Sequence, residues 1–234
     1  MLIPECVAHV AAAAAGKNSR YSLAGVLVQR VDDTTCEAVA TDGIRIIAAR
    51  FEEPACNLSL PKPVAGFQAI VPIAAWREAF ERCSRVISPT GLLIDEAPSS
   101  GRVSPSQLPP KLTLQPIIIY GPKSEWLDPV TCDALPLKFP MCWREVIPDY
   151  HDHRTCDTHA DEDDPAACAD CAVIARLNPK LLSEMLSAFA AFNYNEDRVS
   201  LLMPVKHGIP VVLRAELRDA DIELFGSIMP YLDR

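Results

Sequence analysis

The sequence is poor in features that mark several well-known classes of protein. It has 9 glycines in 234 residues, and none belongs to a glycine-rich loop of the kind that cradles phosphate groups. It contains no motif that pairs a nucleophile with a general base, and no apolar run is long enough to span a membrane. The apolar stretch 6–15 follows Glu5 rather than a basic segment, so we expect no secretory signal peptide. These absences favour a cytoplasmic protein that is not an enzyme.

Positive charge is also scarce, because 22 lysines and arginines stand against 31 acidic residues and the net charge is −9. The acidic excess is unevenly placed. Residues 149–170 hold eight acidic residues and one basic residue, which accounts for −7 of the total. The rest of the chain is near neutral, so charge alone neither excludes contact with DNA nor supports it. We expect residues 149–171 to form an acidic insertion or linker.

This acidic segment also contains two closely spaced pairs of metal-ligating residues. Cys156 and His159 form one pair, and Cys168 and Cys171 form a second pair further along. Two such pairs can hold a tetrahedral zinc ion, which would be a structural rather than a catalytic site. The alternative is an acidic insertion in which these residues are incidental. The protein requires no cofactor on either interpretation.

The rest of the chain repeats one pattern, in which a helix is followed by strands. Three segments predict amphipathic helices that open with proline, namely 4–16, 72–85 and 178–192. Alternating apolar segments predict the strands at 20–31, 36–42, 44–51, 67–71, 90–97, 111–121, 134–139, 171–177, 198–205, 209–217 and 220–230. The unit of strand, helix and three strands therefore occurs three times. It predicts an α+β fold with antiparallel sheets and helices on one face, in which 1–148 holds two units and 172–234 holds one.

One stretch, EAVATDGIRIIAARF at 37–51, places an Asp-Gly turn between two alternating runs and predicts a β-hairpin. Together with the strand before it, this stretch resembles the second domain of the bacterial DNA polymerase III β sliding clamp. The matching residues are Tyr21, Leu23, Gly25, Ala40, Thr41, Asp42, Gly43 and Arg45. Ile44 and Ile46 stand where the family usually has histidine and leucine.

Two further blocks resemble the same family, in the same order along the chain. Residues 139–148, FPMCWREVIP, are similar to the segment that closes the second domain, although Trp143 is displaced by one position. Residues 225–234, FGSIMPYLDR, are similar to the C-terminal tail, with Met229 and Pro230 matching. The resemblance implies a DNA-clamp-like fold and a processivity factor of DNA replication. It covers the second domain and the latter half of the third, so closure of the family's ring is left open.

The resemblance also implies a binding site. In the family, short peptide motifs of polymerases and repair proteins dock in an apolar groove between the second and third domains. The corresponding positions are Leu23, Thr41, Gly43, Ile44, Arg45, Ile46, Ile147, Pro148, Met229, Pro230 and Tyr231. Leu23, Ile46 and Met229 would line an apolar wall, and Arg45 would bond a peptide carbonyl or carboxylate at the rim. Without the resemblance, a role in the core or in a turn is the simpler interpretation of each.

Contact with double-stranded DNA is the weaker part of the resemblance. In the family, helices line a central hole and touch phosphates without reading sequence. The basic residues on or beside the predicted helices are Lys17, Arg20, Arg77, Arg82, Arg85 and Lys180. A solvated helix face explains them equally well.

We therefore expect a clamp-like accessory protein that binds peptide motifs, forms a homo-oligomer and has no membrane partner. The alternatives are an adaptor or competitor that binds such peptides without forming a ring, and a zinc-binding protein of unrelated role.

Overall fold

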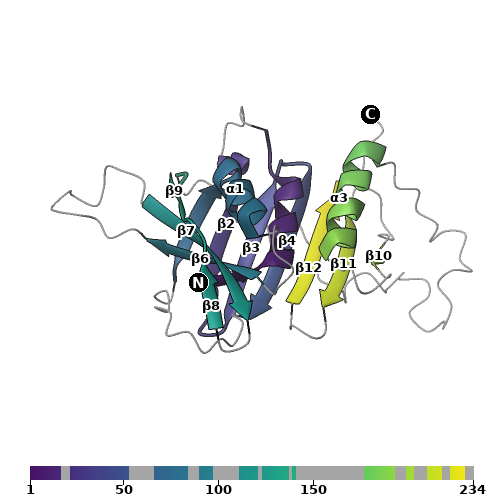
Figure 1. Cartoon of the computed structure of the whole chain (residues 1–234). Helices are drawn as coiled ribbons and strands as arrows, with labels where there is room; N and C mark the ends of the chain where they lie inside the picture. Colours follow the sequence, from purple (N-terminus) through teal and green to yellow (C-terminus); the bar gives the residue numbers. More distant parts are fainter. Residues whose placement is uncertain are drawn as a thin grey trace, which may run out of the picture.

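Two antiparallel sheets and a group of helices make up the part of the chain that the structure, a computed structural model, describes (Figure 1). The predicted α+β fold with antiparallel sheets is confirmed. The structure describes residues 1–16, 22–52, 66–83, 90–96, 111–120, 123–136, 139–140, 177–192, 199–202, 210–217 and 222–229.

The larger sheet has seven strands in the order β10-β11-β12-β4-β3-β2-β5. Their bounds are Gly25–Arg30 for β2, Thr35–Thr41 for β3, Arg45–Glu52 for β4, Gln68–Pro72 for β5, Ser200–Leu202 for β10, Val211–Leu217 for β11 and Ile222–Ile228 for β12. β12 pairs with β4 along its whole length. This pairing joins the strands of the third predicted unit to those of the first in one continuous sheet.

The smaller sheet has five strands, with the order β1-β6-β7-β8 and with β9 paired to another part of β7. Their bounds are Leu2–Pro4 for β1, Thr90–Glu96 for β6, Lys111–Tyr120 for β7, Lys123–Trp126 for β8 and Val130–Asp133 for β9. The strand predicted over 134–139 is wrong for its described residues. Leu135 makes only an isolated bridge with Ile70, because Pro136 next to it has no backbone N–H for a ladder.

Two of the predicted helices are confirmed as α1, Ile73–Cys83, and α3, Pro179–Phe192. The first is instead a 3₁₀ helix, η1, over Glu5–Ala13, and a short 3₁₀ turn, η2, covers Ser22–Ala24. Val7, Val10 and Ala13 are buried at steps of three residues, which is the repeat of a 3₁₀ helix. The predicted stop at Gly16 is also wrong, since the backbone is already extended at Ala14, with φ −68° and ψ 142°.

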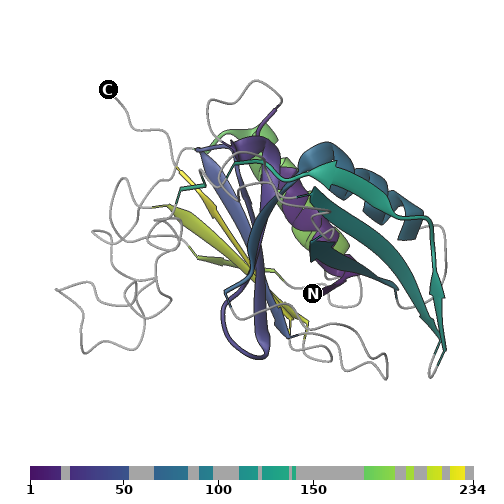
Figure 2. The ribbon, with the colours of Figure 1, turned by 90° about the vertical axis from the view of Figure 1, so that its left-hand side faces the viewer.

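η1 and α3 cover one face of the seven-stranded sheet, and α1 lies beside η1 between this sheet and the smaller one (Figure 2). Strand alternation divides β4 between the two faces. Ile47 and Phe51 belong to the main core under the helices, whereas Ile46 and Ala48 belong to a smaller core on the opposite face. That smaller core also contains Leu27, Val39, Ile70 and Phe139. None of the described helices is long and apolar enough to cross a membrane.

Candidate functional site

The Asp-Gly hairpin forms as predicted, and its turn is held by side chains of its own. Asp42 Oδ1 accepts hydrogen bonds from the backbone N–H groups of Ile44, at 2.9 Å, and Arg45, at 3.0 Å. Thr41 Oγ1 donates to the carbonyl of Arg45 at 2.6 Å and accepts from the N–H of Gly43 at 3.1 Å. Gly43 has φ 91°, a conformation that favours glycine. These hydrogen bonds therefore fix the backbone conformation of the turn.

The end of β12 meets this turn at the seam of the seven-stranded sheet. The pairing of β12 with β4 ends at Ile228 and Arg45. One residue further, the backbone N–H of Met229 donates to the carbonyl of Ile44 at 3.0 Å. The structure thus brings together two of the blocks that resemble the clamp family.

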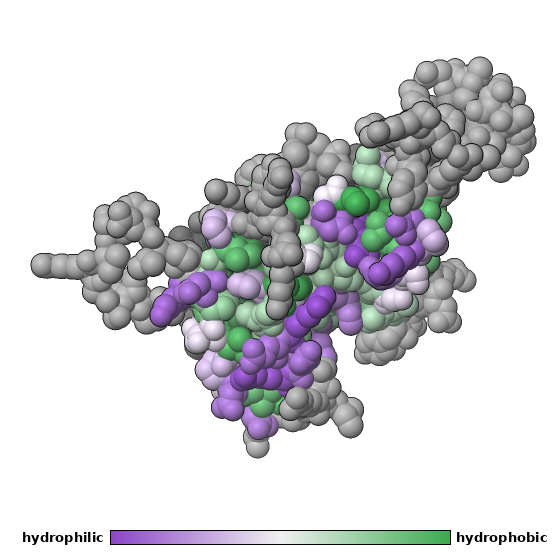
Figure 3. Space-filling view, turned by 90° about the horizontal axis from the view of Figure 1, so that it is seen from above, coloured by the Kyte–Doolittle hydropathy of each residue, from purple (hydrophilic) through white to green (hydrophobic). Residues whose placement is uncertain are grey.

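The side chains at this seam differ sharply in exposure. Ile44 is 53% exposed and Met229 is 37% exposed, whereas Leu23, Thr41 and Ile46 are buried. Figure 3 looks down on this end of the molecule, where hydrophobic residues lie directly beside hydrophilic ones. Ile44 and Met229 therefore offer the apolar surface, and the predicted wall residues Leu23 and Ile46 lie in the interior.

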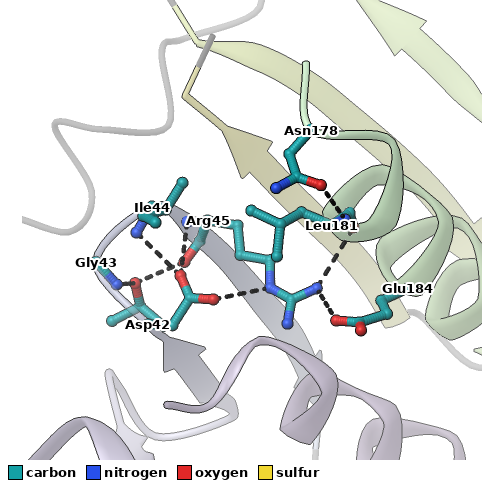
Figure 4. A network of polar contacts seen from close by, with 8 residues as sticks. Asp42, Gly43, Ile44, Arg45, Asn178, Leu181 and Glu184 are labelled. Carbon is teal, nitrogen blue, oxygen red and sulfur yellow. Dashed lines mark hydrogen bonds and ion pairs between the residues drawn. The ribbon is translucent and has the colours of Figure 1, made fainter. Parts of the chain in front are cut away.

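Arg45 lies on the other face of the sheet from its neighbours Ile44 and Ile46. Its Nε bonds Asp42 Oδ2 at 3.1 Å, and its Nη1 lies 2.7 Å from Glu184 Oε2 on α3 (Figure 4). The same nitrogen also donates to the carbonyl of Leu181 at 3.4 Å. The Arg45 side chain is 7% exposed, and these partners compensate for the burial of its charge. Direct binding of a peptide by Arg45 stays a prediction.

A cleft of about 650 Å³ lies on this helix side of the sheet, between η1 and α3. Alanines of both helices form much of its wall, and polar groups surround them. The polar lining consists of His9, Arg45, Arg77, Ser183, Glu184 and Ser187. Burial lowers the pKa of His9, and the nearby Glu5 carboxylate opposes this effect. The Arg45–Glu184 pair can therefore be reached from this cleft.

The residues predicted to face DNA differ in their contacts with the rest of the protein. Arg77 is exposed on α1 and lines the cleft, and Lys180 is exposed in the first turn of α3. Arg82 lies 2.6 Å from Glu78 and donates to the carbonyl of Asp128 at 2.8 Å. The guanidinium of Arg82 therefore already has hydrogen-bond partners within the protein.

Several predicted site residues lie outside the described residues. For the groove these are Ile147, Pro148, Pro230 and Tyr231; for DNA contact, Lys17, Arg20 and Arg85; and for zinc, Cys156, His159, Cys168 and Cys171. Their roles stay predictions. Of the thiols that the structure describes, burial raises the pKa of Cys6 to about 12 and those of Cys83 and Cys132 to about 11, which disfavours the reactive thiolate form.

Comparison with known proteins supports the same fold. No protein-family model matches the chain, and no curated protein matches it. Among solved structures, the chain is similar over its full length to the DNA polymerase III β chain of Streptococcus pneumoniae, with a TM-score of 0.58, 15% identity and 64% of that chain covered. It is similar to the β subunit of Thermotoga maritima with a TM-score of 0.57, 12% identity and 65% covered. It is similar to the sliding clamp of Pseudomonas aeruginosa with a TM-score of 0.55, 16% identity and 66% of that chain covered.

The chain therefore has the fold of the bacterial sliding clamps, as the resemblance implied. It spans just under two thirds of the length of the clamps it matches. At these identities the likeness concerns the fold alone.

Sequence reasoning missed the partners of Arg45 on α3. Asn178 caps this helix, since its Oδ1 accepts from the N–H of Lys180 at 3.0 Å. Nothing in the sequence relates Glu184 to a hairpin so far away in the chain. The alternation of β4, in contrast, is a signal that separates Arg45 from Ile44 and Ile46.

Proposed function

We propose that the protein is a non-enzymatic accessory protein of DNA replication that docks short peptide motifs of polymerase or repair partners. The docking surface consists of Ile44 and Met229 together with the Gly43 turn. The observation that carries the proposal is the pair of exposed apolar side chains joined by the Met229–Ile44 backbone hydrogen bond of 3.0 Å.

This surface has the physical properties that suit an apolar peptide anchor. Ile44 and Met229 lie directly beyond the end of a seven-residue antiparallel ladder and are joined by a backbone hydrogen bond, so little backbone conformational entropy remains to be lost when a partner binds. Methionine adapts its shape to different partners, and isoleucine adds a rigid apolar surface. Leu23 and Ile46 are buried and therefore do not form its wall.

The proposal is tested by fluorescence-anisotropy titration of a labelled clamp-binding peptide. We expect saturable binding by the wild type and a loss of about 1–3 kcal/mol in the binding free energy for both Ile44→Ala and Met229→Ala. The matched control is Val31→Ala, because Val31 is 48% exposed but lies beyond the opposite end of β3. Absence of binding by the folded wild type, or equal losses in the control, would contradict the proposal.

Tethering of the partner to DNA is a further part of the proposed function. It is supported by the clamp fold and by the exposed Arg77 and Lys180 on the helices. Retention of the protein on circular DNA, with light scattering to determine the oligomer, tests this part. Peptide binding by a species that is not retained would instead support the adaptor that forms no ring.

A further inference from the structure

Arg45 connects the end of the sheet that carries the proposed docking surface with helix α3. Its backbone belongs to the first pair of the β4–β12 ladder, opposite Ile228. Its side chain leaves on the helix side, where it meets Asp42 within the turn and Glu184 on α3 (Figure 4). One side chain thus joins the hairpin to a helix that is distant in the sequence.

The carboxylates of Asp42 and Glu184 make different contacts with Arg45. Asp42 uses Oδ1 for the N–H groups of Ile44 and Arg45 and uses Oδ2 for the Arg45 side chain, so the turn conformation and this ion pair depend on the same carboxylate. Glu184 holds the far end of the guanidinium and so fixes where the turn lies relative to α3. The Arg45 side chain is 7% exposed and Glu184 is 40% exposed, so removal of Glu184 leaves a largely buried positive charge with one ionic partner fewer and weakens the contact between the turn and α3.

We infer that Arg45 is a positioning residue for the docking surface, which it supports from the opposite face of the sheet through Asp42 and Glu184. It orients Ile44 for the ligand and holds Ile44 and Met229 at their hydrogen-bonded distance. The part of this inference that concerns peptide affinity rests on the proposed function. The part that concerns the turn does not.

The experiment compares Glu184→Gln with Glu78→Gln in the full chain. Both substitutions keep the size of the side chain and remove a close ion pair to arginine, which is 2.7 Å for Glu184 and 2.6 Å for Glu78. Only Glu184 reaches the turn. The first measurement is NMR hydrogen exchange of the backbone amides of Ile44 and Met229, with thermal unfolding as a check on the global fold.

We expect Glu184→Gln to accelerate exchange of these amides about threefold to tenfold and to weaken binding of the labelled peptide by a similar factor. Glu78→Gln should change neither, even where it lowers the unfolding temperature equally. Arg45→Lys keeps the charge but not the forked donor geometry, so it should give an intermediate effect on both measurements.

The outcomes separate the two proposals. Equal exchange rates in the two glutamine variants would overturn the positioning role, whatever the peptide does. Faster exchange with unchanged peptide affinity would likewise overturn it, because the turn would then move without affecting the docking surface. If the wild type binds no peptide, the proposed function fails, and the exchange rates alone decide whether Arg45 holds the turn.

Discussion

Gly226 on β12 lies so close to Phe189 on α3 that a Cβ at this glycine would come within 2.9 Å of two atoms of the ring. The same Cβ would lie 2.7 Å from Cε of Met185. Helix α3 therefore rests on β12 at a position where no side chain fits. This close approach holds α3 in the place from which Glu184 reaches Arg45.

We predict that Gly226→Ala lowers the free energy of unfolding by about 1–3 kcal/mol, because the extra methyl group must push the helix away from the sheet. Urea denaturation monitored by circular dichroism measures this change. The control is Gly16→Ala, since a Cβ at Gly16 meets nothing within 4 Å. An unchanged midpoint for Gly226→Ala would show that α3 is not packed against β12 as described.

A second prediction concerns Gly43, where the space is open but the backbone is not suited to other residues. A Cβ there meets no atom within 4 Å, yet φ is +91°. Gly43→Ala should lower the free energy of unfolding by about 1–2 kcal/mol, and Gly43→Asn should lower it less, because asparagine tolerates positive φ better. Chemical denaturation of both variants checks the order. If both variants lower the free energy of unfolding equally, the positive φ of the turn is not the reason for glycine at this position.

The third prediction is a dependence of stability on pH through His9, which lines the cleft. Because burial lowers its pKa, the unfolded state binds the proton more tightly than the folded state. The contribution of His9 to stability is therefore present above the ordinary histidine pKa of about 6.5 and is lost as the pH falls toward the lowered value. His9→Gln should lose less stability than the wild type between about pH 8 and pH 5. Parallel profiles of unfolding free energy against pH would contradict this prediction.

Several local parts of the structure were predictable from the sequence, and its long-range pairings were not. The Asp42-Gly43 hairpin, α1 and α3 depend on patterns within a few residues, and all three are confirmed. The pairing of β12 with β4 depends on a register between distant segments, which no short pattern specifies. The strands β8 and β9 were missed because they are only four residues long and carry little apolar alternation.

The residues of the candidate site were likewise predictable from the sequence only in part. Gly43, Ile44 and Met229 were found through the family resemblance, and the structure places them at one seam. The burial of Leu23 and Ile46 agrees with the alternative interpretation of these residues as part of the core, and local sequence could not decide between core and groove wall, because exposure depends on which residues cover that face of the sheet. The position of Arg45 could have been obtained from strand alternation alone, but its partner Glu184 could not.

The last prediction concerns the paired residues Cys156, His159, Cys168 and Cys171, which lie outside the described residues. If they form the proposed structural site, the purified protein should retain one zinc ion per chain after extensive dialysis, measured by mass spectrometry of the metal content. Cys168→Ser should abolish this zinc, whereas Cys56→Ser, which changes a cysteine that is single in the sequence, should keep it. Cobalt substitution should then give the visible absorption of a tetrahedral thiolate site in the wild type and in Cys56→Ser, but not in Cys168→Ser. Substoichiometric metal that is equal in all three proteins would mean that the acidic segment carries these residues without a bound ion.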